Sequence, residues 1–152
     1  MLELVKAKLK DISKMQNLVR EDVEKGVILP RSDDEIATNI RSYTLAFLDG
    51  ELVGYSALHI YTKNLAEVRS LIVSKYFRGQ KIGSEIVKKL IKEAEFYEIS
   101  QIFALTYRKN FFLNLGFNEI SKESLPAQKI WADCIKCKHF PTCNEVAVIF
   151  TL

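Results

Sequence analysis

The sequence predicts an α/β fold in which a mixed, mostly antiparallel β-sheet is flanked by helices on both faces. Short apolar runs of strand character recur from the N-terminus to the closing "EVAVIFTL", and residues 11–25 and 82–97 carry apolar side chains at helical spacing. Asp49-Gly50 joins two β-prone runs, a strong hairpin signal. A strand, a crossover helix and a second strand across 68–107 imply one right-handed parallel unit inside the sheet.

Length and composition favour one compact domain over residues 1–152, because 48% of the residues are hydrophobic and two separate domains would each be small. The net charge is +3, and basic residues are scattered among nearly as many acidic ones, so no nucleic-acid-binding stripe is expected. Apolar runs are only a few residues long. We therefore expect a soluble, cytoplasmic protein that does not enter a membrane.

The N-terminal elements begin with "LELVKAKLK", whose near-alternating pattern predicts a strand. Asp11 is placed to cap a helix that runs to about Lys25 and ends at Gly26. Ser32 and Glu35 have the spacing of a capping box, which predicts a second helix over 33–42.

The middle of the chain predicts a hairpin of strands 44–48 and 51–61, because Asp-Gly tolerates the positive φ angles of a type I′ turn. "LAEVRSLIVS" predicts another strand, after which the period changes to that of the 82–97 helix.

The C-terminal part predicts a short strand in "SQIFALTY", a short helix ending at Gly116, and a strand start in "FNEI". Residues 121–143 form an irregular, cysteine-containing loop without a clean period, and a last strand closes the chain. The expected order is βααβββαβαβ, then the loop, then β.

A glycine-containing loop, "RGQKIG" at 78–83, joins the predicted strand "LAEVRSLIVS" to the predicted helix over 82–97. Its N–H groups and the positive end of the helix dipole could bind a phosphate, and Gly79 and Gly83 allow close backbone approach. An ordinary strand-to-helix turn is the alternative. The nucleoside-triphosphate and dinucleotide glycine motifs are both absent from the sequence.

The strand "VRSLIV" followed by this loop and a helix resembles the GNAT acetyltransferase superfamily, whose signature is a strand, R/Q-x-x-G-x-G/A and a helix. The resemblance implies a GNAT-like fold and acetyl-coenzyme A as co-substrate. The positions that match its pyrophosphate loop are Arg78, Gly79, Gln80, Lys81, Ile82, Gly83 and Ser84. Lys81 stands where the pattern has glycine, and we expect its φ to be negative and its N–H to remain in the phosphate cradle.

A narrower resemblance, to the short bacterial N-acetylglutamate synthases, is carried by "LPRS" at 29–32 and by segments 65–83, 102–117 and 125–149. It implies that the acetyl group goes to the α-amine of L-glutamate, the first step of arginine biosynthesis.

The candidate catalytic residues follow from this chemistry. An ammonium must lose a proton before it attacks a thioester, and Glu67 is placed for that role, unless it is a solvated strand-end residue. The resemblance assigns the oxyanion to backbone N–H groups of Leu71, Ile72 and Val73. Where a tyrosine acid is common in the family this chain has Phe112, which leaves Tyr107 as the proton donor, or no side chain at all.

Three arginines are candidates for binding the carboxylates of the acceptor, because guanidinium groups match carboxylates bidentately. They are Arg31, Arg69 and Arg108. Each one could instead be a surface charge.

The cysteine loop offers four possible zinc ligands, Cys134, Cys137, His139 and Cys143. Their spacing fits a zinc site poorly, so reduced structural thiols are the preferred interpretation and no metal is favoured. Trp131 and Phe140 are expected to pack this loop on the fold.

Other functions fit the same residues. The chain could acetylate another small amine or a protein N-terminus, or it could be a non-catalytic acyl-coenzyme A-binding or metal-sensing module. The expected partner is a small-molecule substrate, and a homodimer is compatible with the sequence.

Overall fold

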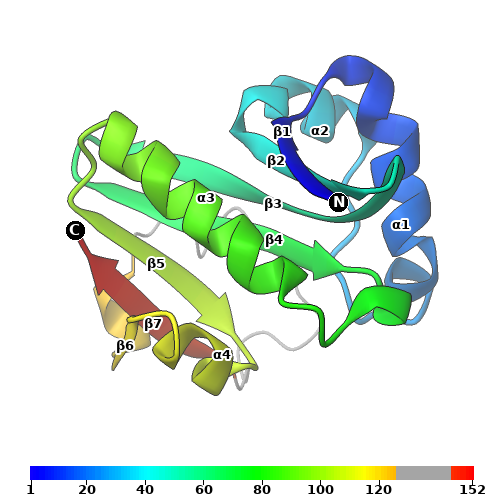
Figure 1. The fold of residues 1–152 in the computed structure, drawn as a ribbon. Coiled ribbons are helices and arrows are strands. Elements are labelled where there is room, and N and C mark those ends of the chain that lie inside the picture. Colours follow the sequence, from blue (N-terminus) through cyan, green and yellow to red (C-terminus); the bar gives the residue numbers. More distant parts are fainter. Residues whose placement is uncertain (126–144) are drawn as a thin grey trace.

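The computed structural model describes residues 1–125 and 145–152 (Figure 1). The strands are β1 (Leu2–Lys6), β2 (Tyr43–Leu48), β3 (Glu51–Thr62), β4 (Leu65–Val73), β5 (Gln101–Thr106), β6 (Asn118–Ile120) and β7 (Val146–Thr151). The α-helices are α1 (Ile12–Glu24), α2 (Asp33–Thr38), α3 (Ile82–Phe96) and α4 (Lys109–Leu113). The predicted order of helices and strands is confirmed.

The seven strands form one sheet in the order β1-β2-β3-β4-β5-β7-β6. Among the described strands, β4 and β5 are parallel and every other neighbouring pair is antiparallel. The structure confirms the mixed, mostly antiparallel sheet, including the parallel unit around α3.

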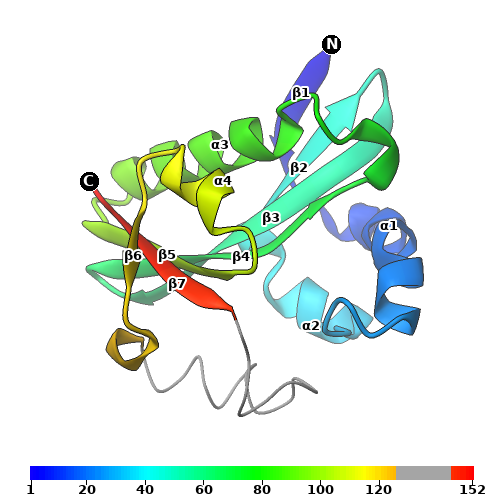
Figure 2. The same ribbon diagram turned by 90° about the horizontal axis from the view of Figure 1, so that it is seen from below.

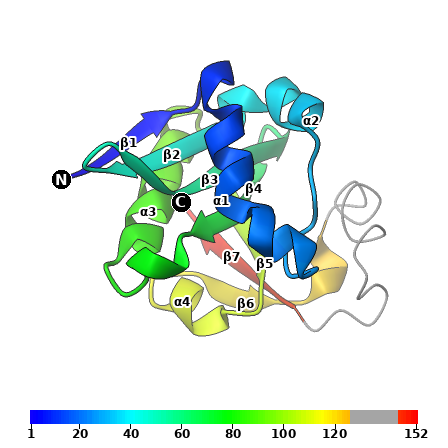
Figure 3. The same cartoon turned by 90° about the vertical axis from the view of Figure 1, so that its right-hand side faces the viewer.

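Helices cover both faces of the sheet, as expected. Figures 2 and 3 show α3 and α1 on opposite faces, with α4 on the side of α3 and α2 on the side of α1. Val87 and Leu90 of α3 pack in one buried cluster with Phe112 of α4, while Met15 and Val19 of α1 pack in another. Two apolar layers therefore sandwich the sheet.

Local sequence signals account for several boundaries. Asp49 and Gly50 have φ angles of 51° and 85°, as a type I′ hairpin turn requires. The Ser32 side chain accepts the Glu35 N–H in the predicted capping box, and Gly26, at φ 74°, follows the end of α1.

Two predicted boundaries are wrong, and the predicted cap of α1 at Asp11 has the right position but a different hydrogen bond. The first strand ends at Lys6, and the chain then forms a 3₁₀ turn over Leu9–Asp11. Asp11 caps this turn by accepting the Lys8 N–H at 2.8 Å, and its side chain makes no capping hydrogen bond to α1. The second helix ends at Thr38, because the Asn39 side-chain amide takes up the Glu35 carbonyl at 2.9 Å and a 3₁₀ turn follows.

None of the helices within the described ranges is both long and apolar enough to cross a bilayer.

Candidate active site

A bulge in β4 shapes the centre of the sheet. Ala57 of β3 lies opposite Arg69 and Tyr55 lies opposite Ile72, so β4 has one more residue than β3 over this interval. Ser70 is in the left-handed region with φ 55°. The Ser56 hydroxyl donates to the Arg69 carbonyl at 2.8 Å and so provides a partner where the regular ladder is interrupted.

Beyond the bulge, β4 separates from β5. The backbone pairing of the two strands ends at Glu67 and Phe103, and Figure 1 shows the strands diverging towards their carboxyl ends. The N–H groups of β4 that point away from β3 therefore face a gap in the sheet.

The alternation of backbone groups identifies which N–H groups these are. Ser74 donates its N–H to Val53 of β3 at 2.8 Å, and successive N–H groups of a strand point in opposite directions. The N–H of Ile72 consequently faces β3, whereas those of Leu71 and Val73 face the gap. Three backbone N–H groups were expected to bind the oxyanion. The N–H of Ile72 points into the sheet, so only those of Leu71 and Val73 are directed at the gap.

The glycine loop lies directly before α3, and its exposed residues run from Arg78 to Lys81. Gly79 has φ 86°, and Lys81 is the N-cap of α3 with φ 63° and ψ 20°. The expectation of a negative φ at Lys81 was wrong. The chain enters the helix through a left-handed residue, which explains why the family pattern has glycine at this position.

The first turn of α3 completes a cradle for an anion. The N–H groups of Ile82, Gly83 and Ser84 belong to the turn in which a helix lacks intrahelical acceptors, and the helix dipole is positive there. A Cβ on Gly83 would lie 3.3 Å from the Phe111 ring of α4, so Gly83 also allows α3 and α4 to pack closely. The N–H groups at the start of α3 are thus placed where an anion is electrostatically favoured.

Glu67 is a buried charge in the middle of the sheet, with an exposed fraction of 1%. The Tyr61 hydroxyl donates to its Oε1 at 2.8 Å, and Arg69 Nε lies 3.7 Å from the same oxygen. The alternative of a solvated strand-end glutamate was wrong, because β4 is covered on both sides and Glu67 pairs with His59 of β3 and Phe103 of β5.

A hollow on the α1 and α2 side of the sheet lies next to Glu67. Its lining residues come from the α2 region, β2, β3 and β4: Arg31, Asn39, Ser42, Tyr43, Ala57, His59, Arg69 and Ser70. Two of the three candidate arginines therefore meet there. Arg31 Nη1 is 3.8 Å from Glu35 at the protein surface, and the Arg69 side chain is only 13% exposed.

Arg108 lies elsewhere. It follows β5, is exposed, and its guanidinium stands 5.7 Å from the centre of the Phe111 ring. Arg31 and Arg69 therefore line the same hollow, and Arg108 does not line it.

The sequence pattern of the Acetyltransferase (GNAT) family matches residues 12–117. The chain belongs to the GNAT acetyltransferase family. It is 36% identical over 146 residues to an uncharacterised N-acetyltransferase of Chlorobaculum tepidum. The aligned region covers 96% of this chain and 94% of that protein. As an acetyl-coenzyme A-dependent N-acetyltransferase, the chain has the activity that the loop predicted.

More distant GNAT relatives include enzymes named for amino-acid substrates. The amino-acid acetyltransferase of Shewanella oneidensis is 32% identical over 128 residues, which are 83% of this chain and 29% of that protein. N-acetylglutamate synthase of Neisseria gonorrhoeae, solved with coenzyme A and N-acetyl-glutamate, superposes with a TM-score of 0.87 at 25% identity. That match covers 100% of this chain and 35% of the synthase, so the chain spans about a third of these longer enzymes.

Two aromatic residues near the end of β5 differ in environment. Tyr107 is 61% exposed, whereas Phe112 is buried and packs edge-on against Phe111 and Phe117. In this GNAT domain Phe112 is therefore part of the apolar core.

Two residues in this region were missed by the sequence reasoning: His59 and Tyr61 of β3. Both share a face with Ala57 by strand alternation, but only the pairing of β3 with β4 places them at Glu67. Burial raises the pKa of the neighbouring Tyr55 hydroxyl, and the Tyr43 hydroxyl raises it further, so Tyr55 stays neutral beneath the hollow.

The predicted cysteine loop, with Cys134, Cys137, His139 and Cys143, lies outside the described residues, as do Trp131 and Phe140. Within residues 1–125 and 145–152, no group of three or more His, Cys, Asp or Glu side chains is arranged to hold a metal ion.

Proposed function

We propose that this N-acetyltransferase transfers the acetyl group of acetyl-coenzyme A to the α-amine of an amino acid, with L-glutamate as the leading acceptor, as in the first step of arginine biosynthesis. The observation that carries the proposal is the meeting of Arg31 and Arg69 in one hollow beside the buried Glu67. The relatives named amino-acid acetyltransferase and N-acetylglutamate synthase support it.

The hollow suits an acceptor with carboxylate groups. Each guanidinium has five N–H donors in a planar fork, so it can hold a carboxylate while keeping a second acceptor. Glutamate carries two carboxylates, one beside its α-amine and one on its side chain. Arg108 remains a proposed acceptor contact on the strength of the resemblance alone.

The gap between β4 and β5 suits the acetyl donor. Leu71 and Val73 direct N–H groups into it, and the loop from Arg78 to Ser84 lies at its open end, where α3 begins. We assign the loop to the pyrophosphate and the β4 N–H groups to the acyl end of the co-substrate.

Glu67 is assigned as the general base. It takes a proton from the acceptor ammonium, directly or through a water molecule, and the free amine attacks the acetyl carbon. A C–N bond forms, the C–S bond breaks, and the nitrogen releases its second proton to solvent as the amide forms. Coenzyme A leaves as a thiolate that takes a proton from solvent or from Tyr107. The N–H of Leu71 stabilises the oxyanion that develops at the acetyl oxygen.

The test is to incubate the protein with acetyl-coenzyme A and a panel of amino acids and to measure thiol release. Turnover is expected with glutamate and not with amino acids that lack a side-chain carboxylate or amide. Glu67→Gln keeps the size of the side chain but removes the base, and its kcat is expected to fall by about 10²–10⁴-fold. The absence of turnover with both glutamate and glutamine would overturn the acceptor assignment.

The second candidate acceptor is a protein N-terminus or another small amine. An arginine-lined hollow favours a molecule that carries carboxylates over a peptide N-terminus, which brings an ammonium without an adjacent carboxylate. Turnover with peptides and with neutral amines, but not with glutamate, would favour this alternative.

A further inference from the structure

We propose that Tyr61 is a positioning residue for the reaction, which holds the Glu67 carboxylate in its ionised form and in the orientation that the acceptor amine requires. This inference rests on the proposed role of Glu67 as the base. Tyr61 belongs to neither the glycine loop nor the arginine set, and it approaches Glu67 from the neighbouring strand.

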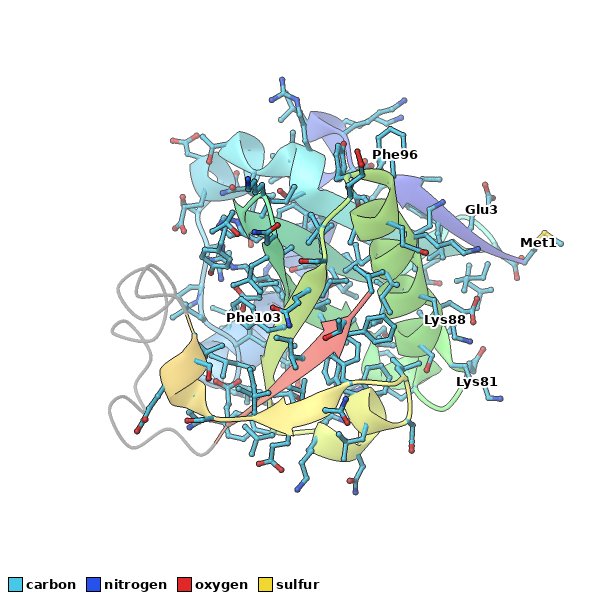
Figure 4. The ribbon with its side chains drawn as sticks, turned by 90° about the vertical axis from the view of Figure 1, so that its left-hand side faces the viewer. Met1, Glu3, Lys81, Lys88, Phe96 and Phe103 are labelled. Atoms are coloured by element: carbon cyan, nitrogen blue, oxygen red, sulfur yellow. The ribbon has the colours of Figure 1, made fainter. Side chains whose placement is uncertain are left out.

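The geometry fixes the Tyr61 ring on two sides. Its centre is 5.7 Å from that of Phe103 on β5 and 4.7 Å from that of His59, which it meets edge-on at 71°. Phe103 is almost fully buried, and Figure 4 shows it on the central part of the sheet. The hydroxyl that donates to Glu67 therefore comes from a ring packed between Phe103 and His59, which lowers the conformational entropy lost when the bond forms.

The hydrogen bond has an electrostatic consequence. Burial disfavours the charged form of a carboxyl group, while a hydrogen bond donated to the carboxylate favours it. At 2.8 Å the Tyr61 hydroxyl donates to Oε1, and Arg69 is 3.7 Å from the same atom. A base must be ionised to accept a proton, so Tyr61 and Arg69 together keep Glu67 active at lower pH than burial alone would allow.

Within the described residues, the other titratable and charged groups that line the adjoining hollow are His59 of β3, Tyr43 of β2 and Arg31 before α2, and the buried Tyr55 of β3 packs against Tyr43. Tyr61→Phe leaves them in place. It also keeps the aromatic ring against Phe103 and removes only the hydroxyl.

The experiment measures kcat/KM for the acceptor against pH in the wild type, Tyr61→Phe and Tyr97→Phe. The acceptor is whichever amine of the panel is turned over fastest. Tyr97 is an exposed residue at the end of α3 and serves as the matched control. In Tyr61→Phe the acid limb of the profile is expected to move up by about one pH unit, and kcat/KM at neutral pH to fall by about tenfold.

The KM for acetyl-coenzyme A and the melting temperature are expected to stay close to wild type, because phenylalanine keeps the ring against Phe103 and His59. An unchanged acid limb in Tyr61→Phe, with Glu67→Gln strongly impaired, would overturn the role of Tyr61 alone. Full activity of Glu67→Gln would instead overturn the proposed base, and this inference with it. If glutamate is not an acceptor but another amine is, the same pH profiles are measured with that amine and decide the role of Tyr61 in the same way.

Discussion

Replacing Lys81 by glycine is expected to stabilise the protein without loss of coenzyme A binding. Lys81 has φ 63° and ψ 20°, a region in which a Cβ lies too close to the backbone. The strain is about 1–2 kcal/mol for an L-residue, and the greater freedom of glycine in the unfolded chain returns about 0.4–1 kcal/mol of this. The net gain in unfolding free energy is therefore about 0.8 kcal/mol at the midpoints of these ranges, and at most about 1.6 kcal/mol.

Coenzyme A binding is expected to be kept because of the position of the Lys81 side chain. Its side chain is exposed, and Figure 4 shows it at the molecular surface beside the start of α3. If backbone N–H groups hold the pyrophosphate, the Kd for coenzyme A should stay within about threefold of wild type. Loss of a direct ammonium–phosphate hydrogen bond would instead weaken binding by roughly tenfold or more.

Urea unfolding measures the change in unfolding free energy, and calorimetric titration measures the Kd for coenzyme A. A gain of this size corresponds to a rise in Tm of about 1–4 °C for a domain of this length. Lys81→Ala is the matched control, because it removes the ammonium but keeps the Cβ in the left-handed region. Its stability is expected to remain near that of the wild type.

A second comparison comes from the other end of the same helix. Glu98 has φ 63° after the end of α3, where Ile99 donates its N–H to the Ala94 carbonyl at 3.0 Å. Glu98→Gly should also stabilise the protein, with coenzyme A binding unchanged. Equal stabilisation by Lys81→Ala and Lys81→Gly, or a Lys81→Gly protein less stable than wild type, would refute the strain argument.

Three further predictions test the site and its support. Arg31→Lys should raise KM for the acceptor by about tenfold or more while KM for acetyl-coenzyme A is unchanged, because lysine lacks the bidentate fork; equal effects on both constants would contradict an acceptor role. Gly54→Ala should lower the unfolding free energy by about 1–3 kcal/mol in urea, since the added Cβ would lie 2.7 Å from the Ile72 carbonyl oxygen; wild-type stability would show that β4 adjusts freely. Tyr107→Phe should leave kcat within about threefold, because a thiolate is a good leaving group and Tyr107 is largely exposed; a loss of tenfold or more would identify it as the proton donor.

The sequence by itself determined the features that depend on neighbouring residues. The hairpin at Asp49-Gly50, the capping box of Ser32 and the start of α3 after the glycine loop all follow from local backbone chemistry. Strand and helix periods, read together with the loop, were enough to predict the sheet and the acetyltransferase family. The positive φ of Lys81 comes from the way the chain enters α3, at the position where the family pattern has glycine, and the lysine itself does not indicate it.

Tertiary structure alone decided which residues meet in the candidate active site. The register of β3 against β4 brings Tyr61 to Glu67, and the flanking strands bury that carboxylate. The β4 bulge directs the N–H groups of Leu71 and Val73, and not that of Ile72, into the gap beside β5. Register, bulges and burial depend on contacts between segments distant in the chain, and a shift of one residue in register would turn every side chain to the opposite face. Periodicity within a single strand carries no such information.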